Sequence, residues 1–269
     1  MEEEGKNALE VGKEEEKEDQ ARSEEESRRA LICSSSSYIA RTDGIMVRKT
    51  NDRRRARVPQ SLTGLFDRKW VKLVAIVFAI ELLALVFSSM VPLNQDQQSS
   101  LLTVLNSSRS EIMNQSMAGA AVYIFAHNLG IATLEITPGV GLLVFSGSTA
   151  LTGLTLGAEA ASYGLPPALV ALVLFTLPST WFELAAYAIA VVANIYILRA
   201  IFRGGFTGEL RRYASSWVLA GAVLLIAAML ESFEIQSEQS NPVSAYLAWI
   251  PAAIIILLTV LLLRRKTKG

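Results

Sequence analysis

Several polar side chains that could do chemistry lie inside long apolar segments of this chain. They are Glu81, His127, Asn128, Glu183, Asn194 and Glu231. A charged residue near the centre of a bilayer costs roughly 2.5–3.5 kcal/mol on insertion scales, so such residues usually face a protein interior and mark substrate or ion pathways. These positions are therefore the candidate functional residues of the chain.

Glu183 has the most informative neighbours. It is followed by Tyr187, Ala190 and Asn194 at spacings of four, three and four residues, which places all of them on one face of a helix. A polar face of this kind would point into a helix bundle rather than toward lipid.

The residues before Glu183 suggest how its helix begins. Pro178 is expected to break the preceding segment, and Thr180-Trp181-Phe182-Glu183 fits a capping box with Thr180 as the cap. Two interpretations stay open. Glu183 only satisfies the amides at the start of the helix, or it also contacts a partner or substrate.

The sequence lacks the patterns of catalytic and metal sites. One Cys, Cys33, and one His, His127, exclude a disulfide framework and a His/Cys zinc site within one chain. No His-Glu-x-x-His motif and no Gly-x-x-x-x-Gly-Lys loop occurs. A pair of His127 with Ser146 or Ser148 is conceivable but has no further support. We expect no catalytic residue, no metal, no cofactor and no enzyme activity.

The distribution of charge shows which part of the chain enters a membrane. Residues 1–72 hold 15 of the 25 acidic and 16 of the 25 basic residues, which leaves 19 charges for the other 197 residues. A soluble domain carries about 25% charged residues, so this remainder is not one. Runs long enough to cross a hydrocarbon core of roughly 30 Å are Leu73–Val91, Met117–Ile136, Gly139–Ala158, Ser179–Leu198, a run within Tyr213–Phe233, and Tyr246–Leu263.

One further apolar run, Pro166–Leu177, would reach only about 18 Å as a helix. Its length and bounding prolines are typical of re-entrant or half helices. If it crossed, Arg199, Arg203 and the bases after them would move outside, against the cytoplasmic preference of Lys and Arg. The sequence therefore predicts an all-α polytopic bundle of six transmembrane helices plus one re-entrant or half helix, in the cell membrane with both termini cytoplasmic.

The chain divides into four segments. Residues 1–45 are expected to be a disordered acidic tail, and Met46 is a candidate second start site. The basic juxtamembrane segment 46–72 would hold its side in the cytoplasm and contact anionic lipid, rather than nucleic acid. The helix bundle 73–263 and a basic cytoplasmic tail 264–269 follow.

Two further features bear on how the spans are connected and packed. Asn94–Ser116 is expected to be a long external loop, with glycosylation sequons at Asn106 and Asn114. The third span is rich in small residues, and its closely spaced glycines predict a central helix with close neighbours. The candidate packing glycines are Gly139, Gly141, Gly153 and Gly157.

The order of these motifs resembles the stage II sporulation protein M family of integral membrane proteins. The resemblance covers about Tyr123 to Phe233 and rests on Phe125-Ala126-His127-Asn128, Pro138-Gly139-Val140-Gly141, Thr152-Gly153 with Gly157, Pro178 with Glu183, and Ala227-Ala228-Met229-Leu230-Glu231. This chain has Thr152 where the family has Asn, and Ser179-Thr180 where it has His-Gly. A proton-handling role of that His would be lost here. The namesake works with cell-wall hydrolases during engulfment, which the resemblance implies for relatives.

Three functions follow. The first expectation is a non-enzymatic scaffold or subunit of a membrane or envelope complex, with the lipid bilayer and other membrane proteins as partners and homo-oligomerisation open. The alternative is a transporter or channel component that uses the helix break at Pro178 and buried carboxylates. An intramembrane enzyme ranks last.

Overall fold

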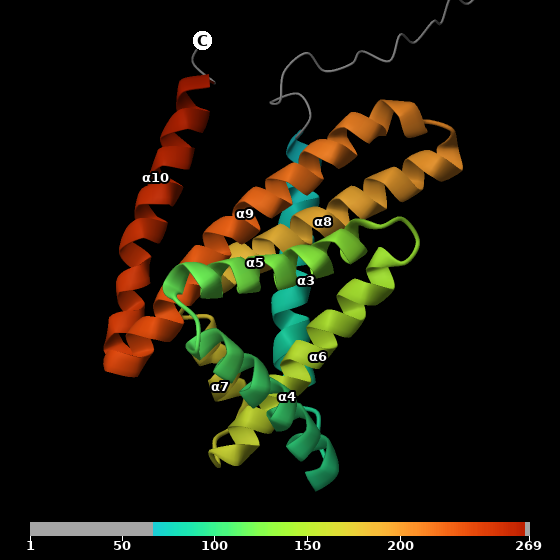
Figure 1. Ribbon diagram of the computed structural model, residues 1–269. Coiled ribbons are helices and arrows are strands. Elements are labelled where there is room, and N and C mark those ends of the chain that lie inside the picture. Colours follow the sequence, from blue (N-terminus) through green and yellow to red (C-terminus); the bar gives the residue numbers. More distant parts are fainter. Residues whose placement is uncertain (1–66, 267–269) are drawn as a thin grey trace, which may run out of the picture. The chain divides into compact units, whose positions relative to one another are not determined.

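The computed structural model describes residues 67–266, except the side chains of 239, 240, 242 and 262–266. All its elements are helical (Figure 1): α3 (Arg68–Ser89), α4 (Gln95–Met113), α5 (Met117–Ile136), α6 (Gly141–Ser162), α7 (Pro167–Leu174), α8 (Pro178–Arg203), α9 (Phe206–Ser240), the 3-10 helix η1 (Pro242–Ala248) and α10 (Trp249–Lys266). The tail 1–45, Met46, most of segment 46–72 and the end of segment 264–269 lie outside the described residues.

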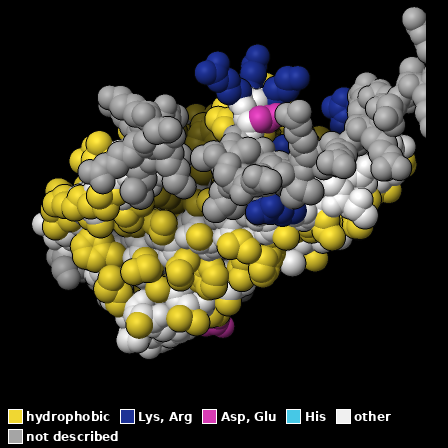
Figure 2. Space-filling model, turned by 90° about the horizontal axis from the view of Figure 1, so that it is seen from above, with side chains coloured by type: hydrophobic (Ala, Val, Ile, Leu, Met, Phe, Trp, Pro, Cys, Tyr) yellow, Lys and Arg dark blue, Asp and Glu magenta, His cyan; other side chains and the backbone are white. Residues whose placement is uncertain are grey.

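Six helices of the described region are long and apolar enough to cross a membrane, which confirms the number predicted. They are α3, α5, α6, α8, Phe206–Glu238 of α9, and Val243–Leu261, which includes most of η1 and α10. Figure 2 shows apolar side chains over much of one face, with Lys and Arg gathered along one side. Helix α9 has 35 residues and reaches about 52 Å, because polar segments at both ends of its apolar part also stay helical.

The short helix α7 does not cross. Its eight residues span about 12 Å. In Figure 1 it lies between the lower end of α6 and the start of α8, so it turns the chain round at that end of the bundle. Whether α7 dips into lipid stays a prediction.

The expectation that Asn94–Ser116 is a loop is wrong, because most of it forms α4, and its external position stays a prediction. Asn94 and Gln97 close a reciprocal capping box, in which each side chain accepts a hydrogen bond from the other residue's backbone amide at 2.8 and 3.0 Å. Arg109 then pairs with Glu159 of α6 at 3.3 Å. Apolar runs do not predict this helix, because its sequence is polar.

Helix α8, not α6, is the centre of the bundle. Of the residues in its most apolar 18-residue stretch, 67% are buried, against 39% for α6. Helix α8 packs against α3, α5, α6 and α9. The reason is a run of small and β-branched residues that lets neighbours approach on all sides: Ala186, Ala188, Ala190, Val191, Val192 and Ala193. The expectation that the glycine-rich third span is central is therefore wrong.

The glycines predicted to pack helices in and before α6 have different roles. A Cβ at Gly153 would meet the carbonyl oxygen of Leu85 at 2.7 Å, and one at Gly157 would collide with the carbonyl oxygen of Ser89. These two glycines thus permit close contact between α6 and α3. Gly139 is different: its φ of 86° serves the turn before α6 and nothing lies near its Cβ position, so its assignment to helix packing is wrong.

Candidate functional site: the polar face of α8

Four polar residues line one face of α8: Ser179, Glu183, Tyr187 and Asn194, which we call the α8 polar face. Ser179, Tyr187 and Asn194 are buried, and Glu183 is half-buried. From Ser179 to Asn194 the helix rises about 22 Å, which is most of a hydrocarbon core of roughly 30 Å. The helical face predicted from the spacing of Glu183, Tyr187 and Asn194 thus lies against neighbouring helices.

At the first end of this face, Glu234 of α9 binds the start of α8. The backbone amide of Ser179 donates to Glu234 Oε1 at 3.2 Å, and the Ser179 hydroxyl donates to Glu234 Oε2. A carboxylate that accepts from first-turn donors is stabilised by the helix N-terminus. Glu234 comes from 55 residues further along the chain, and the sequence reading did not select it.

The predicted capping role of Thr180 is wrong. The N-cap residue is Leu177, which makes no side-chain cap, and Pro178 occupies the first turn. Because α8 begins at this proline, Thr180 already lies inside the helix, where its hydroxyl donates to the carbonyl oxygen of Leu174 at 3.1 Å. Glu183 therefore takes no part in the capping box that the sequence predicted.

In the middle of the face, Glu183 accepts a hydrogen bond from the Tyr187 hydroxyl at 3.1 Å. Glu231 of α9 interacts electrostatically with Glu183, Glu234 and Tyr187. The Oε2 atom of Glu231 is buried and accepts no hydrogen bond from any described residue. Carboxyl groups from α8 and α9 thus lie in the same region as the buried Tyr187.

At the far end, Asn194 joins α8 to the end of α5. Its Nδ2 donates to the carbonyl oxygens of Glu135 and Thr137 at 2.8 and 2.7 Å, which caps the C-terminus of α5. A Cβ at Gly141 would overlap both the Glu135 carbonyl oxygen and Asn194 Nδ2. Gly141 is therefore needed where α6 begins, against the amide of Asn194.

Glu135 and Glu81 extend the polar region to α5 and α3. Both side chains are almost fully buried, at 1% and 2% exposure. Ser148 of α6 donates to Glu135 Oε1 at 3.0 Å, but the Oε2 atoms of Glu135 and Glu81 have no hydrogen-bond partner among the described residues. Glu81 interacts electrostatically with Glu135 and Glu183. One turn before Glu81, the Phe78 ring packs against that of Trp181 at 5.7 Å, which fixes α3 beside the start of α8.

The structure therefore brings five carboxyl groups from four helices to one region, the carboxyl cluster: Glu81, Glu135, Glu183, Glu231 and Glu234. In the described part of the chain, the ion pairs Arg109–Glu159 and Arg212–Glu209 involve none of them. The described residues also contain no group of three or more His, Cys, Asp or Glu side chains placed to hold a metal ion.

Two predicted candidates stand apart from this cluster. His127 is exposed on α5, on the face that points away from the bundle. Asn128 is buried on α5, in the stripe that also contains Ala132 and Glu135. Ser146 is exposed as well, and Ser148 donates to Glu135.

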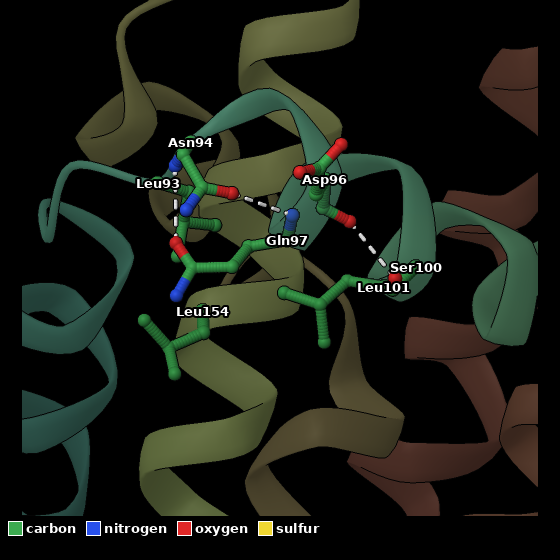
Figure 3. A pocket seen from close by; sticks show the side chains of 7 residues that line it. All are labelled: Leu93, Asn94, Asp96, Gln97, Ser100, Leu101 and Leu154. Carbon is green, nitrogen blue, oxygen red and sulfur yellow. Dashed lines mark hydrogen bonds between the residues drawn. The ribbon is translucent and has the colours of Figure 1, made fainter.

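Two surface hollows lie outside the carboxyl cluster. One, of about 430 Å³, lies between the start of α4 and Leu154 of α6 (Figure 3), and its polar lining is occupied by the hydrogen bonds of α4 itself. The second is an apolar groove of about 480 Å³ between α9 and α10, lined by residues such as Met229, Phe233 and Ile250. Neither contains a residue of the α8 polar face.

A comparison with known families decides what this bundle is. The model of a family described as stage II sporulation protein M matches residues 73–234, more than half of the chain. The chain belongs to the stage II sporulation protein M family. The match includes the whole carboxyl cluster, begins about fifty residues before the stretch recognised from motifs, and ends before α10. No curated protein and no solved structure matches the chain. The family match and the apolar helices together indicate that the chain is a multi-pass membrane protein.

Proposed function

We propose that this member of the stage II sporulation protein M family is a non-enzymatic component of a membrane transport system, with the α8 polar face as the path of an ion or small solute. One observation carries the proposal: the carboxyl cluster lies along this face without a basic partner in the described residues. From the sequence alone, the scaffold role ranked first. The convergence of acids from α3, α5, α8 and α9 reverses that order.

The energetic argument is direct. Burying a carboxyl group without an ion pair is costly, and a protein that only needed packing would place an apolar side chain there. Glu81 illustrates the point, because it lies in the middle of α3, is 2% exposed and leaves one oxygen without a described partner. Such residues persist in membrane bundles where a substrate or ion needs them.

The test is electrical. Purified full-length protein in a planar bilayer, with salt and pH gradients, is expected to pass a current that Glu183→Gln abolishes. Glu238→Gln is the matched control, because Glu238 is an exposed carboxylate on α9 outside the cluster. A wild-type current that survives Glu183→Gln would contradict the assignment of the path.

A second candidate function is that of a subunit in a larger membrane complex, for which α10 is the supporting feature. Only 17% of the residues in the most apolar stretch of its span, Val243–Leu261, are buried, and α10 packs mainly against η1. The apolar groove between α9 and α10 is left open. A partner helix of another membrane or envelope protein, or of a second copy, would fit there. Stoichiometric recovery of one protein in mild detergent, lost when residues 243–269 are deleted, would support this function.

We further propose that the protein resides in the cell membrane with both termini in the cytoplasm. The described bases near helix ends support this orientation, since Arg199, Arg203, Arg211 and Arg212 all flank the α8–α9 connection.

A further inference from the structure

We infer that the substrate of the α8 polar face is the proton, an inference that rests on the proposed transport function. The geometry behind it is the arrangement of hydroxyl groups between the carboxyl groups. Ser179 donates to Glu234, Tyr187 to Glu183, and Ser148 to Glu135, so each of these three carboxyl groups is paired with a hydroxyl of another residue.

A hydroxyl group suits this place because it donates one proton and accepts another. A chain of carboxyl and hydroxyl groups can therefore pass a proton by successive hydrogen bonds, as in the acidic relays of pumps and transporters. Here two such pairs, Ser179–Glu234 and Tyr187–Glu183, follow each other along α8 at a spacing of eight residues, about 12 Å. Glu231 interacts electrostatically with the carboxyl groups of both pairs, Glu183 and Glu234.

Glu81 supplies the independent observation. Its carboxyl group enters the region from α3, interacts with Glu135 and Glu183, and leaves Oε2 buried without a hydrogen-bond partner among described residues. An isolated buried carboxylate is so unfavourable that the neutral acid is the form a bundle accommodates. In the proposed relay Glu81 is the neutral member that supplies a proton toward Glu135 or Glu183.

Each transfer step is a simple proton exchange. The O–H bond of a neutral carboxyl breaks, a new O–H bond forms on the neighbouring carboxylate or through Tyr187, and the donor is left with the negative charge. No oxidant, reductant or leaving group is involved. The titratable side chains that face this path are Glu81 of α3, Glu135 of α5, Glu183 and Tyr187 of α8, and Glu231 and Glu234 of α9.

A metal cation fits the same region less well. Hard cations are surrounded by about six oxygen ligands, which usually include several carboxylate or carbonyl oxygens from one site. In the described residues no three acidic side chains converge on one point, because the cluster is drawn out along α8. A proton can move along an extended row of side chains, because each transfer needs only one neighbouring group.

The experiment uses liposomes that hold the purified full-length protein and a trapped pH-sensitive dye. A potassium diffusion potential set with valinomycin drives positive charge inward. Wild-type protein is expected to acidify the interior, while Glu183→Gln and Glu81→Gln reduce the rate to that of protein-free liposomes. Glu238→Gln should retain the wild-type rate, because that exposed carboxylate lies outside the path.

Tyr187→Phe keeps the buried ring and removes only the hydroxyl, so it tests the relay even if a Gln variant fails to fold. A reduced proton rate in a monodisperse Tyr187→Phe protein supports the inference, and an unchanged rate overturns it. A bilayer current whose reversal potential follows Na⁺ or K⁺ and ignores pH overturns the proton assignment but leaves transport intact. The absence of any current overturns both.

Discussion

Glu234 on α9 holds the first turn of α8 by accepting hydrogen bonds from both the backbone amide and the hydroxyl of Ser179. The two residues lie 55 positions apart in the chain, so this contact joins the two most extensively packed helices at the end where α8 begins. It also puts the last member of the carboxyl cluster beside a helix N-terminus, where a negative charge is stabilised.

Removal of this contact should weaken the bundle. We expect Ser179→Ala to lower the free energy of unfolding by about 1–3 kcal/mol, because Glu234 would lose a buried hydrogen-bond donor. Thermal unfolding in detergent measures the change. The double variant Ser179→Ala/Glu234→Gln should be less destabilised than the sum of the single variants, and strict additivity would contradict a direct contact.

Gly141 offers a test of the junction of α5, α6 and α8. We expect Gly141→Ala to destabilise the protein by about 1–3 kcal/mol, because its methyl group would overlap the Glu135 carbonyl and the Asn194 amide. Gly147→Ala is the matched control on the same helix, since nothing lies within 4 Å of its Cβ position. There the better helix propensity of Ala should raise stability by up to about 1 kcal/mol. Equal effects of the two substitutions would show that the junction is not tight.

Glu81 should reveal a conflict between stability and transport. Replacing an unpaired buried carboxyl with an apolar side chain of similar volume often stabilises a protein, so Glu81→Met is expected to raise the melting temperature while it abolishes proton flux. Glu238→Met, at an exposed position of α9, should change neither. A strongly destabilised Glu81→Met protein would mean that this carboxyl makes contacts essential to the fold.

The orientation can be read by labelling single cysteines in a Cys33→Ser background. Ser107→Cys is expected to react with an impermeant thiol reagent added outside intact cells, since Ser107 is exposed on α4, and Figure 1 shows α4 at the end opposite the α8–α9 connection. Thr207→Cys, at the start of α9, should react only after the cells are permeabilised. The reverse pattern would invert every helix in the membrane.

Much of the bundle was predictable from the sequence because lipid imposes a simple rule on length and polarity. Six spans and the position of Pro178 follow from apolar runs and prolines, and Glu183, Tyr187 and Asn194 follow from helical spacing. Helix α4 was not predicted, because a polar helix contains no apolar run. Asn94 and Gln97 nevertheless have the spacing of a capping box.

The partners of the site were harder to predict, since they depend on contacts between distant segments. A local capping pattern made Thr180 look like the start of α8, whereas the real partner of that end, Glu234, is fixed only by the packing of α8 on α9. Glu135 lay at the edge of a predicted span, with no local sign that Ser148 would bind it. Packing, rather than periodicity, decides these pairs.

The length of α9 has a consequence for the surrounding lipid. Its segment Phe206–Glu238 has 33 residues and is about 50 Å long, but only the stretch from Tyr213 to Leu230 is free of charged side chains, and that stretch is about 27 Å long. This stretch fits a bilayer interior of roughly 30 Å, and the charged residues on either side of it belong to the rest of the helix. The first turns of α9, which carry Glu209, Arg211 and Arg212, therefore extend toward the headgroups or beyond them, and the length of the helix requires no thickening of the bilayer.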